Sequence, residues 1–426
     1  MTPDLIFAIV PRLLPTFMLG FVALLGLLLL RKSASDVISG TVKTMVGVLV
    51  LFAGVDILVN AITPIATLFG KVYTSQGEQI TADWVGFLGQ FGVAIVLIML
   101  FGFLVNLILA RITPLKYVFL TGHILFWNAF MVTAALADGG RLTGVPLIIV
   151  GSLILGVIST VFPALIARFV FSLTGTKDFS IGHTTTVHAL LGAWVGKLVG
   201  RGSPSLEDAK LPESWSFIKS MTISTSLIMF LLYLVMGFVA GPAWAAEKFT
   251  GSNQVIWYFW TLYQALLFGA GLTVLLAGVR MMLAEIIPAF HGLAQKVVPQ
   301  AVPALDCPMV FPYGQNSLAL GFPIAMVFSL ITLVIFGLAG FRYLLLPLVV
   351  AAFFDVGPGV ILANHTGGRR GAFVYAALGG ILLIVLQALA LPFVSHTAAG
   401  FVNLFGGNDF SVIAIVVGGV ARLFGL

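Results

Sequence analysis

Residues 179–186 read FSIGHTTT and place a glycine, a histidine and three threonines beside sequence apolar enough to enter a bilayer. Two further polar clusters share this setting, LTGH at 120–123 and ALDCP at 304–308. A polar group in hydrocarbon is costly without a partner, so polar residues at membrane depth predict a functional site. Glycine and proline beside them predict non-helical backbone, which persists there only under protein cover or along a watery cavity. The clusters therefore predict broken helices around a buried polar-solute site.

The composition indicates an integral membrane protein. Of the 426 residues, 60% are hydrophobic and 8% are charged, whereas a soluble domain is about a quarter charged. Apolar stretches of about 20 residues without period-two alternation favour helices over a barrel. The net charge of +6 is better explained by basic cytoplasmic loops than by nucleic-acid binding. The single cysteine excludes an internal disulfide and a cysteine-rich metal site.

The expected fold is an all-α membrane protein with about eleven transmembrane helices plus re-entrant hairpins. An odd number of spans puts the termini on opposite sides. With the N-terminus outside and the C-terminus cytoplasmic, 16 of the 21 basic residues lie inside and 5 outside, as the positive-inside rule requires. The expected spans are 13–30, 36–59, 88–110, 117–137, 144–168, 221–245, 255–278, 320–340, 343–362, 371–394 and 409–425.

Three connections are too apolar or too long for simple loops, namely 60–87, 170–219 and 279–319. Within the third, the amphipathic stretch VRMMLAEIIPAFHGLAQKV predicts a helix lying at the inner interface. The other two are interpreted as re-entrant hairpins. No soluble domain is expected, so residues 1–426 are interpreted as a single polytopic membrane domain.

The first cluster continues into a helix on which His123 and Trp127 share a face, with Asn128 beside them. Imidazole and amide groups suit hydroxyls, and an indole suits the C–H face of a sugar or polyol. The alternative is that His123 bonds a neighbouring helix while Trp127 packs in the core.

In the second cluster, Ser180 can cap a following helix and Gly182 can relieve the turn. Residues 183–186 would then present side chains or free N–H groups at a half-helix start, which attracts anionic groups of a solute. The alternative is an ordinary serine cap, and His188, one turn on, is expected to be structural. The predicted ligands here are His183, Thr184 and Thr185.

Asp306 lies between Pro303 and Pro308, where a continuous helix is not expected. Its carboxylate can accept hydroxyl hydrogen bonds and act as a general base if the solute is phosphorylated. The alternative is a capping aspartate at a broken helix. Gln315 is a candidate to complete the pocket or to cap the next helix, and Cys307 is expected to be a packing residue.

The chain shows no phosphate loop, no adequate metal-ligand set and no nucleotide fingerprint. No cofactor or metal is therefore predicted, and ATP-driven transport would need another chain. Asp56, in the middle of the second expected span, is a candidate to be a buried partner or to line a path.

At these clusters the sequence resembles enzyme IIC, the membrane permease subunit of the ascorbate family of the bacterial phosphoenolpyruvate-dependent phosphotransferase system. The resemblance covers nearly the whole chain. The motifs that carry it are LLLRKSASDVISGTVKTMVGVLVLFAG (28–54), LTGHILF (120–126), DFSIGH (178–183), LEDAKLP (206–212), GVRMMLAE (278–285), ALDC (304–307) and ANHTGGRRGA (363–372).

The resemblance implies a homodimer in the bacterial inner membrane, surrounded by lipid. Each subunit would have eleven spans, with a core domain moving like an elevator against a scaffold domain. The solute would be phosphorylated by a separate enzyme IIB, itself served by enzyme IIA, since this chain has no phosphoryl-donor residue. His123, His183, Thr184 and Asp306 match the family's binding positions, and Thr81 and Asp83 fall near another.

The sequence departs from the ascorbate pattern at Trp127, at the threonines 184–186 and at FPYGQNS (311–317), which is closer to the related galactitol branch. Where ascorbate transporters have glutamine, this chain has Trp127 and the threonines 184–186. The predicted substrate is therefore ascorbate or a related sugar acid, pentose or polyol, with Asp306 or His183 accepting the hydroxyl proton. The alternatives are a proton-coupled secondary transporter that uses Asp56, Asp306 or a histidine, and a membrane sensor that binds the solute without moving it.

Overall fold

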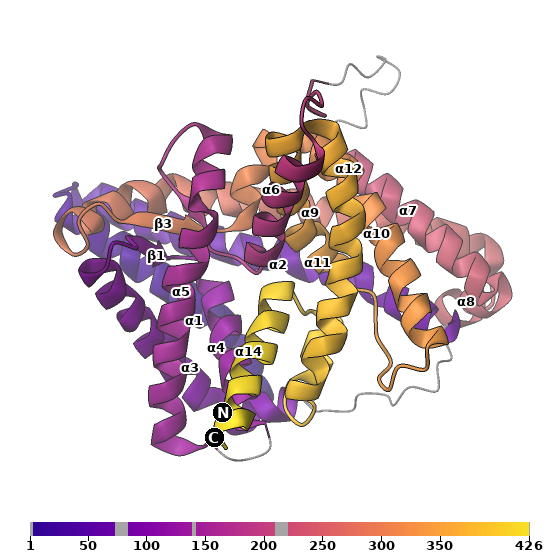
Figure 1. The fold of residues 1–426 in the computed structure, drawn as a ribbon, viewed down its shortest axis with the longest axis horizontal. Helices are drawn as coiled ribbons and strands as arrows, with labels where there is room; N and C mark the ends of the chain where they lie inside the picture. The colour runs from indigo at the N-terminus through magenta and orange to yellow at the C-terminus, as the bar shows by residue number, and fades with distance from the viewer. Residues whose placement is uncertain (1–2, 73–83, 139–141, 209–219, 426) are drawn as a thin grey trace.

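The computed structural model describes residues 3–72, 84–138, 142–208 and 220–425, and most of these are helical (Figure 1). The α-helices are α1 (Pro3–Leu29), α2 (Ala34–Val72), α3 (Trp84–Ile112), α4 (Gly122–Ala137), α5 (Gly144–Thr174), α6 (Thr186–Val199), α7 (Met221–Ala240), α8 (Pro242–Thr250), α9 (Gln254–Lys296), α10 (Gln315–Leu338), α11 (Val349–Ala351), α12 (Gly357–Ala390), α13 (Ala399–Leu404) and α14 (Asn408–Phe424). Shorter helical segments are η2 (Cys307–Tyr313), η3 (Ala352–Val356) and η4 (Leu391–Phe393). The strands are β1 (Tyr117–Phe119), β2 (Ser180–Ile181) and β3 (Val302–Leu305).

Helices long and apolar enough to cross a bilayer confirm the expected all-α membrane class. Within the described residues there are six, or up to seven if the bent pair of α7 and α8 forms one span. The expected span at 117–137 is instead a strand followed by the 16-residue α4. The expected interfacial helix after residue 278 continues α9, which runs unbroken to Lys296. The count of eleven remains a prediction.

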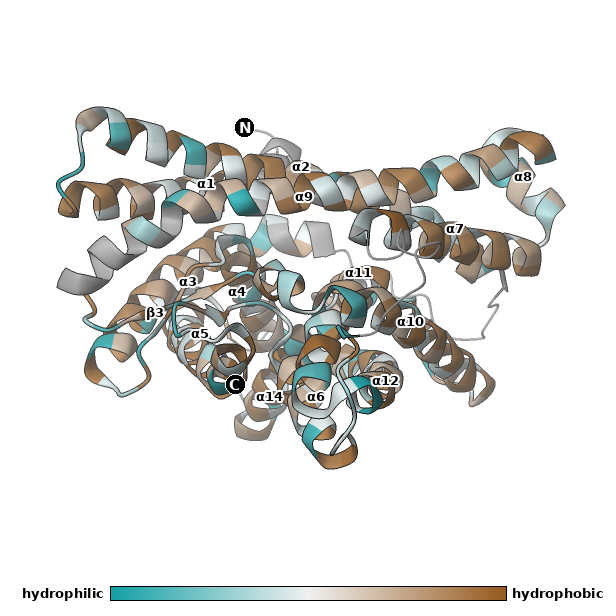
Figure 2. Cartoon of the chain, turned by 90° about the horizontal axis from the view of Figure 1, so that it is seen from above, coloured by the Kyte–Doolittle hydropathy of each residue, from teal (hydrophilic) through white to brown (hydrophobic). Residues whose placement is uncertain are grey.

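The helices form two layers, seen edge-on in Figure 2. One layer contains α1, α2, α7, α8 and α9, and the other contains the strands and the remaining helices. In the first layer α2 and α9 run antiparallel with their backbones in close contact, because glycines replace side chains at the crossing. A Cβ on Gly54 would lie 2.3 Å from the backbone nitrogen of Leu275, and one on Gly278 would lie 2.3 Å from that of Leu51.

Two expected spans, 343–362 and 371–394, pack as the two arms of a hairpin within the segment Val349–Phe393. The helical backbone breaks at Gly367 and Gly368, and Gly368 adopts a φ of 57°. The arms are antiparallel, because a Cβ on Gly371 would meet the carbonyl of Ala363 and one on Gly379 would meet Val356. The ANHTGGRR motif therefore forms the turn of this hairpin.

The three short strands form one parallel sheet in the order β1-β3-β2. Ala304 of β3 pairs with Phe119 of β1 and with Ser180 of β2. The edge strands are held from outside the sheet. Asn106 of α3 accepts from the Phe119 N–H and donates to the Tyr117 carbonyl, both at 3.0 Å. The Ser180 hydroxyl donates to the Pro163 carbonyl at 2.8 Å instead of capping a helix.

Candidate functional site

The sheet brings the three polar clusters together, because the candidate ligand of each cluster follows the end of one parallel strand. Asp306 directly follows β3, His183 lies two residues after β2, and His123 stands in the first turn of α4, which follows β1. The carboxyl ends of parallel strands meet at one edge of a sheet. His123, His183 and Asp306 are far apart in sequence, but their side chains therefore lie together at this edge of the sheet.

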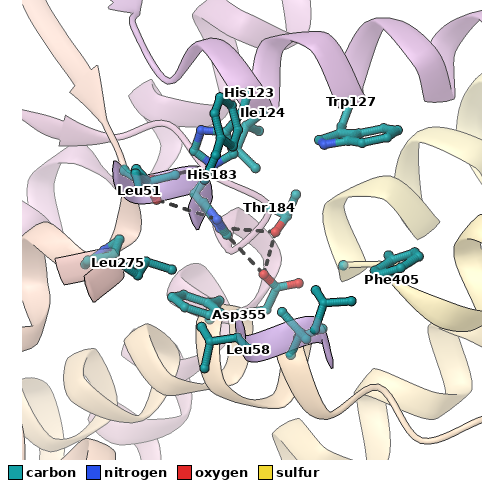
Figure 3. A pocket seen from close by; sticks show the side chains of 18 of the residues that line it. Leu51, Leu58, His123, Ile124, Trp127, His183, Thr184, Leu275, Asp355 and Phe405 are labelled. Atoms are coloured by element: carbon teal, nitrogen blue, oxygen red, sulfur yellow. Dashed lines mark hydrogen bonds and ion pairs between the residues drawn. The ribbon is translucent and has the colours of Figure 1, made fainter. Parts of the chain in front are cut away.

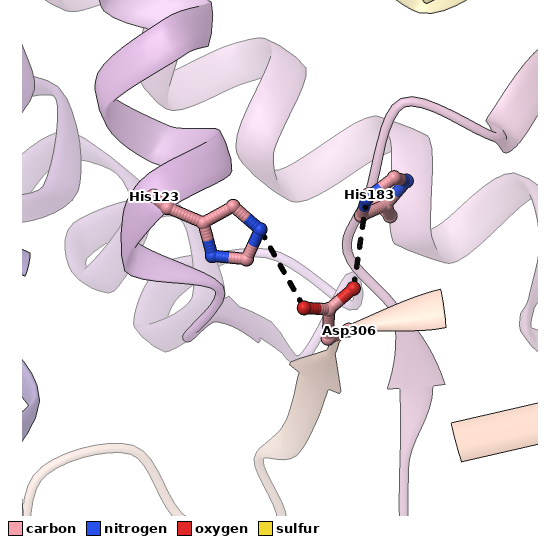
Figure 4. Close-up of side chains that lie close together, drawn as sticks. All are labelled: His123, His183 and Asp306. Carbon is pink, nitrogen blue, oxygen red and sulfur yellow. Dashed lines mark ion pairs between the residues drawn. The ribbon is translucent and has the colours of Figure 1, made fainter. Parts of the chain in front are cut away.

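Asp306 stands between the two histidines (Figure 4). His123 Nε2 lies 3.5 Å from Asp306 Oδ2, and His183 Nε2 lies 3.6 Å from Asp306 Oδ1. Asp306 is 4% exposed, and its Oδ1 accepts the Cys307 N–H at 2.7 Å as the cap of η2. The two interpretations of Asp306, cap and site residue, are thus compatible, since one carboxylate makes the cap and faces both imidazoles.

Asp355, a carboxylate in the helical segment η3, supports His183 from the opposite side (Figure 3). Its Oδ1 accepts the Thr184 hydroxyl and lies 3.7 Å from His183 Nδ1. Its Oδ2 accepts the Asn408 N–H at 2.9 Å, and its backbone carbonyl accepts the Thr185 hydroxyl at 2.6 Å. Asp355 is 1% exposed, so the bonds that its side-chain oxygens accept from Thr184 and Asn408 stabilise an acidic group that would otherwise be costly to bury.

The start of α6 is capped by this chain's own Asp409. The Thr186 and Val187 N–H groups each donate to one Asp409 oxygen at 2.9 Å. Of the N–H groups of residues 183–186 that were expected to be free for an anionic solute, that of Thr186 is therefore already bonded within the chain. His188 is buried between Tyr375 and Asn408, as its expected structural role requires.

The two histidines and Asp306 face a cavity of about 580 Å³, large enough for a small sugar or polyol. Residues of α2 and α9 line it from one layer, among them Asp56, Asn60 and Leu275. The other layer contributes the three site residues, Thr184, Asp355 and aromatic side chains. The aromatic residues on this wall are Trp127, Phe354, Phe401, Phe405 and Phe410.

The other predicted ligands are placed differently. Trp127 lines the cavity with its indole stacked on Phe401, at 4.7 Å between ring centres. Asn128 is buried outside the cavity lining, and its Oδ1 has no hydrogen-bond partner among the residues that the structure describes. Gln315 is exposed at the start of α10, also outside the lining. Thr185 does not line the cavity and donates its hydroxyl to the backbone carbonyl of Asp355. Thr81 and Asp83 lie outside the described residues.

The sequence reasoning missed Asp355, although the signal was present. The residue interrupts the apolar run AAFFDVGPG at 351–359. A carboxylate in such a run is a functional-site hypothesis by default, and the same argument was applied to Asp56. Asp409 was missed because it falls at the expected start of a span, where an acidic residue is ordinary.

Comparison with known proteins supports the family resemblance seen in the sequence over nearly the whole chain. Residues 10–409 match the family EIIC-GAT, described as the PTS system sugar-specific permease component. A curated relative is the ascorbate-specific PTS system EIIC component of Mycoplasma pneumoniae. It is 27% identical over 457 residues, which cover 94% of this chain and 68% of the relative.

Proposed function

This chain belongs to the sugar-specific permease family of the phosphotransferase system, and from that premise we propose that it binds a polyhydroxylated solute at His123, His183 and Asp306. The substrate class is ascorbate or a related sugar acid or polyol. The observation that carries the proposal is the convergence of three family-motif residues at one sheet edge, facing a cavity between the layers.

The chemistry of the cavity suits a small polyol or sugar acid. Asp306 accepts hydroxyl hydrogen bonds, and each imidazole donates or accepts according to its tautomer. Trp127 offers an apolar edge beside them. Asp306 Oδ2 is the better candidate for the general base, because Oδ1 already accepts the Cys307 N–H. During phosphoryl transfer it would take the proton of the attacking hydroxyl.

The phosphoryl donor would be a separate phosphorylated enzyme IIB, itself served by enzyme IIA. A second crevice, of about 370 Å³, lies at the turn of the α12 hairpin and is lined by Lys197, Arg201 and His365. The lysine and arginine of this crevice carry cationic side chains of the kind that recognise phosphorylated partners, so this surface is a candidate for docking. In this proposal the turn faces the cytoplasm of a bacterium, with the N-terminus of the chain outside.

Transport would proceed by movement of one layer against the other, with the solute carried between them. In this elevator scheme the layer with α2 and α9 is the scaffold that pairs two subunits, and the layer with the sheet is the core. The cavity supports the scheme, because it takes its lining from both layers.

The test is uptake in cells that lack their own ascorbate and galactitol systems, with and without matched enzymes IIA and IIB. Labelled ascorbate, galactitol and pentitols are supplied, and the internal product is identified by mass spectrometry. We expect a phosphorylated product that requires both partners. Accumulation of free solute that an uncoupler abolishes would contradict the proposal and favour the proton-coupled alternative, for which the carboxylates of Asp56, Asp306 and Asp355 would be carriers.

A further inference from the structure

We propose that His123, His183 and Asp306 also form a binding site for a transition-metal dication of the Zn²⁺ type. The metal would use the same atoms as the sugar and would therefore compete with it. Metal binding itself stands on the geometry of this site alone, whereas the competition rests on the proposed function.

The distances between the ligand atoms of His123, His183 and Asp306 (the triad) suit a cation shared by the three side chains better than they suit direct hydrogen bonds. The two N···O distances, from His123 to Asp306 Oδ2 and from His183 to Asp306 Oδ1, are 3.5 and 3.6 Å, which is beyond the usual range for a hydrogen bond. Neighbouring ligand atoms around a tetrahedral zinc ion, with bonds of about 2.0–2.1 Å, lie about 3.3–3.4 Å apart. One ligand atom from each of the three side chains lies within 4.8 Å of the others, so small side-chain shifts complete the shell.

The donor set indicates which metals would bind. Two imidazole nitrogens and one carboxylate oxygen match the three protein ligands of open zinc sites, in which water or substrate takes the fourth position. Here the fourth position faces the cavity. Imidazole favours zinc, copper and nickel, whereas Mg²⁺ prefers oxygen ligands alone.

The surroundings of the triad hold the ligands in a metal-binding orientation. Thr184 Oγ1 lies 3.1 Å from His183 Nδ1, with Asp355 Oδ1 at 3.7 Å behind it. A proton on Nδ1 donated to Thr184 Oγ1 leaves the Nε2 lone pair facing Asp306, and a hydrogen bond from the other ring nitrogen orients metal-ligating histidines in this way.

The ligands also stand on fixed backbone. Asp306 is held by its bond from the Cys307 N–H, and His183 follows a glycine whose N–H donates to the Leu305 carbonyl at 2.7 Å. The positions of two ligands are thus set by adjacent strands of one sheet. Metal sites built on rigid elements need little reorganisation.

The first test is metal binding by the full-length protein, purified in detergent through a tag without histidine. Zn²⁺ is titrated by calorimetry, and Co²⁺ is followed by its visible d–d absorption. We expect one ion per chain, with the strong absorption of a four- or five-coordinate cobalt site and no binding of Mg²⁺. His183→Gln and His123→Gln should each weaken Zn²⁺ binding at least tenfold. His396→Gln, which changes an exposed histidine outside the cavity, should leave it unchanged.

The second test follows transport. Zn²⁺ should raise the apparent KM for the sugar and leave kcat unchanged. Weak octahedral cobalt absorption, or binding that survives both His123→Gln and His183→Gln, would overturn the metal site. Metal binding without an effect on KM would overturn the competition. If Zn²⁺ binds as described but no sugar is phosphorylated with the partners present, the proposed function fails and the metal site stands.

Discussion

At the scale of single residues, Asp355 acts on the site through its neighbours. It accepts the Thr184 hydroxyl and lies beside His183 Nδ1. Losing a hydrogen bond to a buried carboxylate costs about 1–3 kcal/mol. We expect Thr184→Val and Asp355→Asn each to weaken sugar binding about tenfold, because both loosen the orientation of His183.

The coupling of Asp355 and Thr184 is tested by a double-mutant cycle. Since the two residues share one hydrogen bond, the double variant should bind little worse than either single variant. The readout is the affinity of the purified protein for the transported sugar. Fully additive losses would show that the two residues act independently and would contradict the assigned role of Asp355.

Trp127 lies at the cavity wall with its indole stacked on Phe401, and we expect it to contribute an apolar ring surface to sugar binding. Trp127→Ala should weaken sugar affinity about tenfold, whereas Trp127→Phe should keep most of it, since an aromatic contact is worth about 0.5–1.5 kcal/mol beyond its area. The measurement is equilibrium binding of labelled sugar. Equal losses in both variants would indicate that the indole N–H, and not the ring surface, makes the contact.

At the scale of elements, the three-stranded sheet is what assembles the site, and Gly182, which directly follows β2, packs closely against β1 and β3. A Cβ at this position would lie 3.0 Å from both the Ala304 Cβ and the Phe119 ring. Gly182→Val should therefore separate β2 from β3, destabilise the protein by about 1–3 kcal/mol and abolish sugar binding. Thermal unfolding and binding are measured together.

The matched control for Gly182→Val is a glycine with open space around it. A Cβ on Gly92 of α3 would meet nothing within 4 Å, so Gly92→Ala should leave both stability and binding intact. Normal sugar binding by Gly182→Val would show that the sheet does not set the position of His183.

The sheet also marks the limit of what the sequence could predict. The three clusters, and His123, His183 and Asp306 within them, were predicted because polar residues stand out in apolar sequence. The strands were not predicted. β2 has two residues and β1 has three, too few to establish a period-two pattern. Their pairing depends on contacts between segments far apart in the chain, and the capping of α6 by Asp409 depends on the same kind of contact.

At the scale of the whole molecule, the two-layer arrangement explains why the proposed sugar site lies between long helices. The antiparallel pair of α2 and α9 gives a rigid wall with small residues at its crossing, and the sheet edge faces it across the cavity. Composition predicted the membrane class, and the motif order predicted the family that the comparison confirms. The division into two layers could not be predicted from the sequence. The expected spans ended at residues 59 and 278, whereas α2 continues to Val72 and α9 to Lys296.

The central claim is that Asp306, held between two histidines, is the sugar-binding and proton-accepting group of a phosphotransferase permease. The most direct measurement is the partner-dependent phosphorylation of bound sugar by Asp306→Asn, compared with Asp178→Asn as a control at an exposed aspartate. Asparagine keeps the shape but cannot accept the proton. We predict at least a hundredfold loss of phosphorylated product for Asp306→Asn and none for Asp178→Asn. Full phosphorylation by Asp306→Asn at unchanged sugar affinity would contradict the claim.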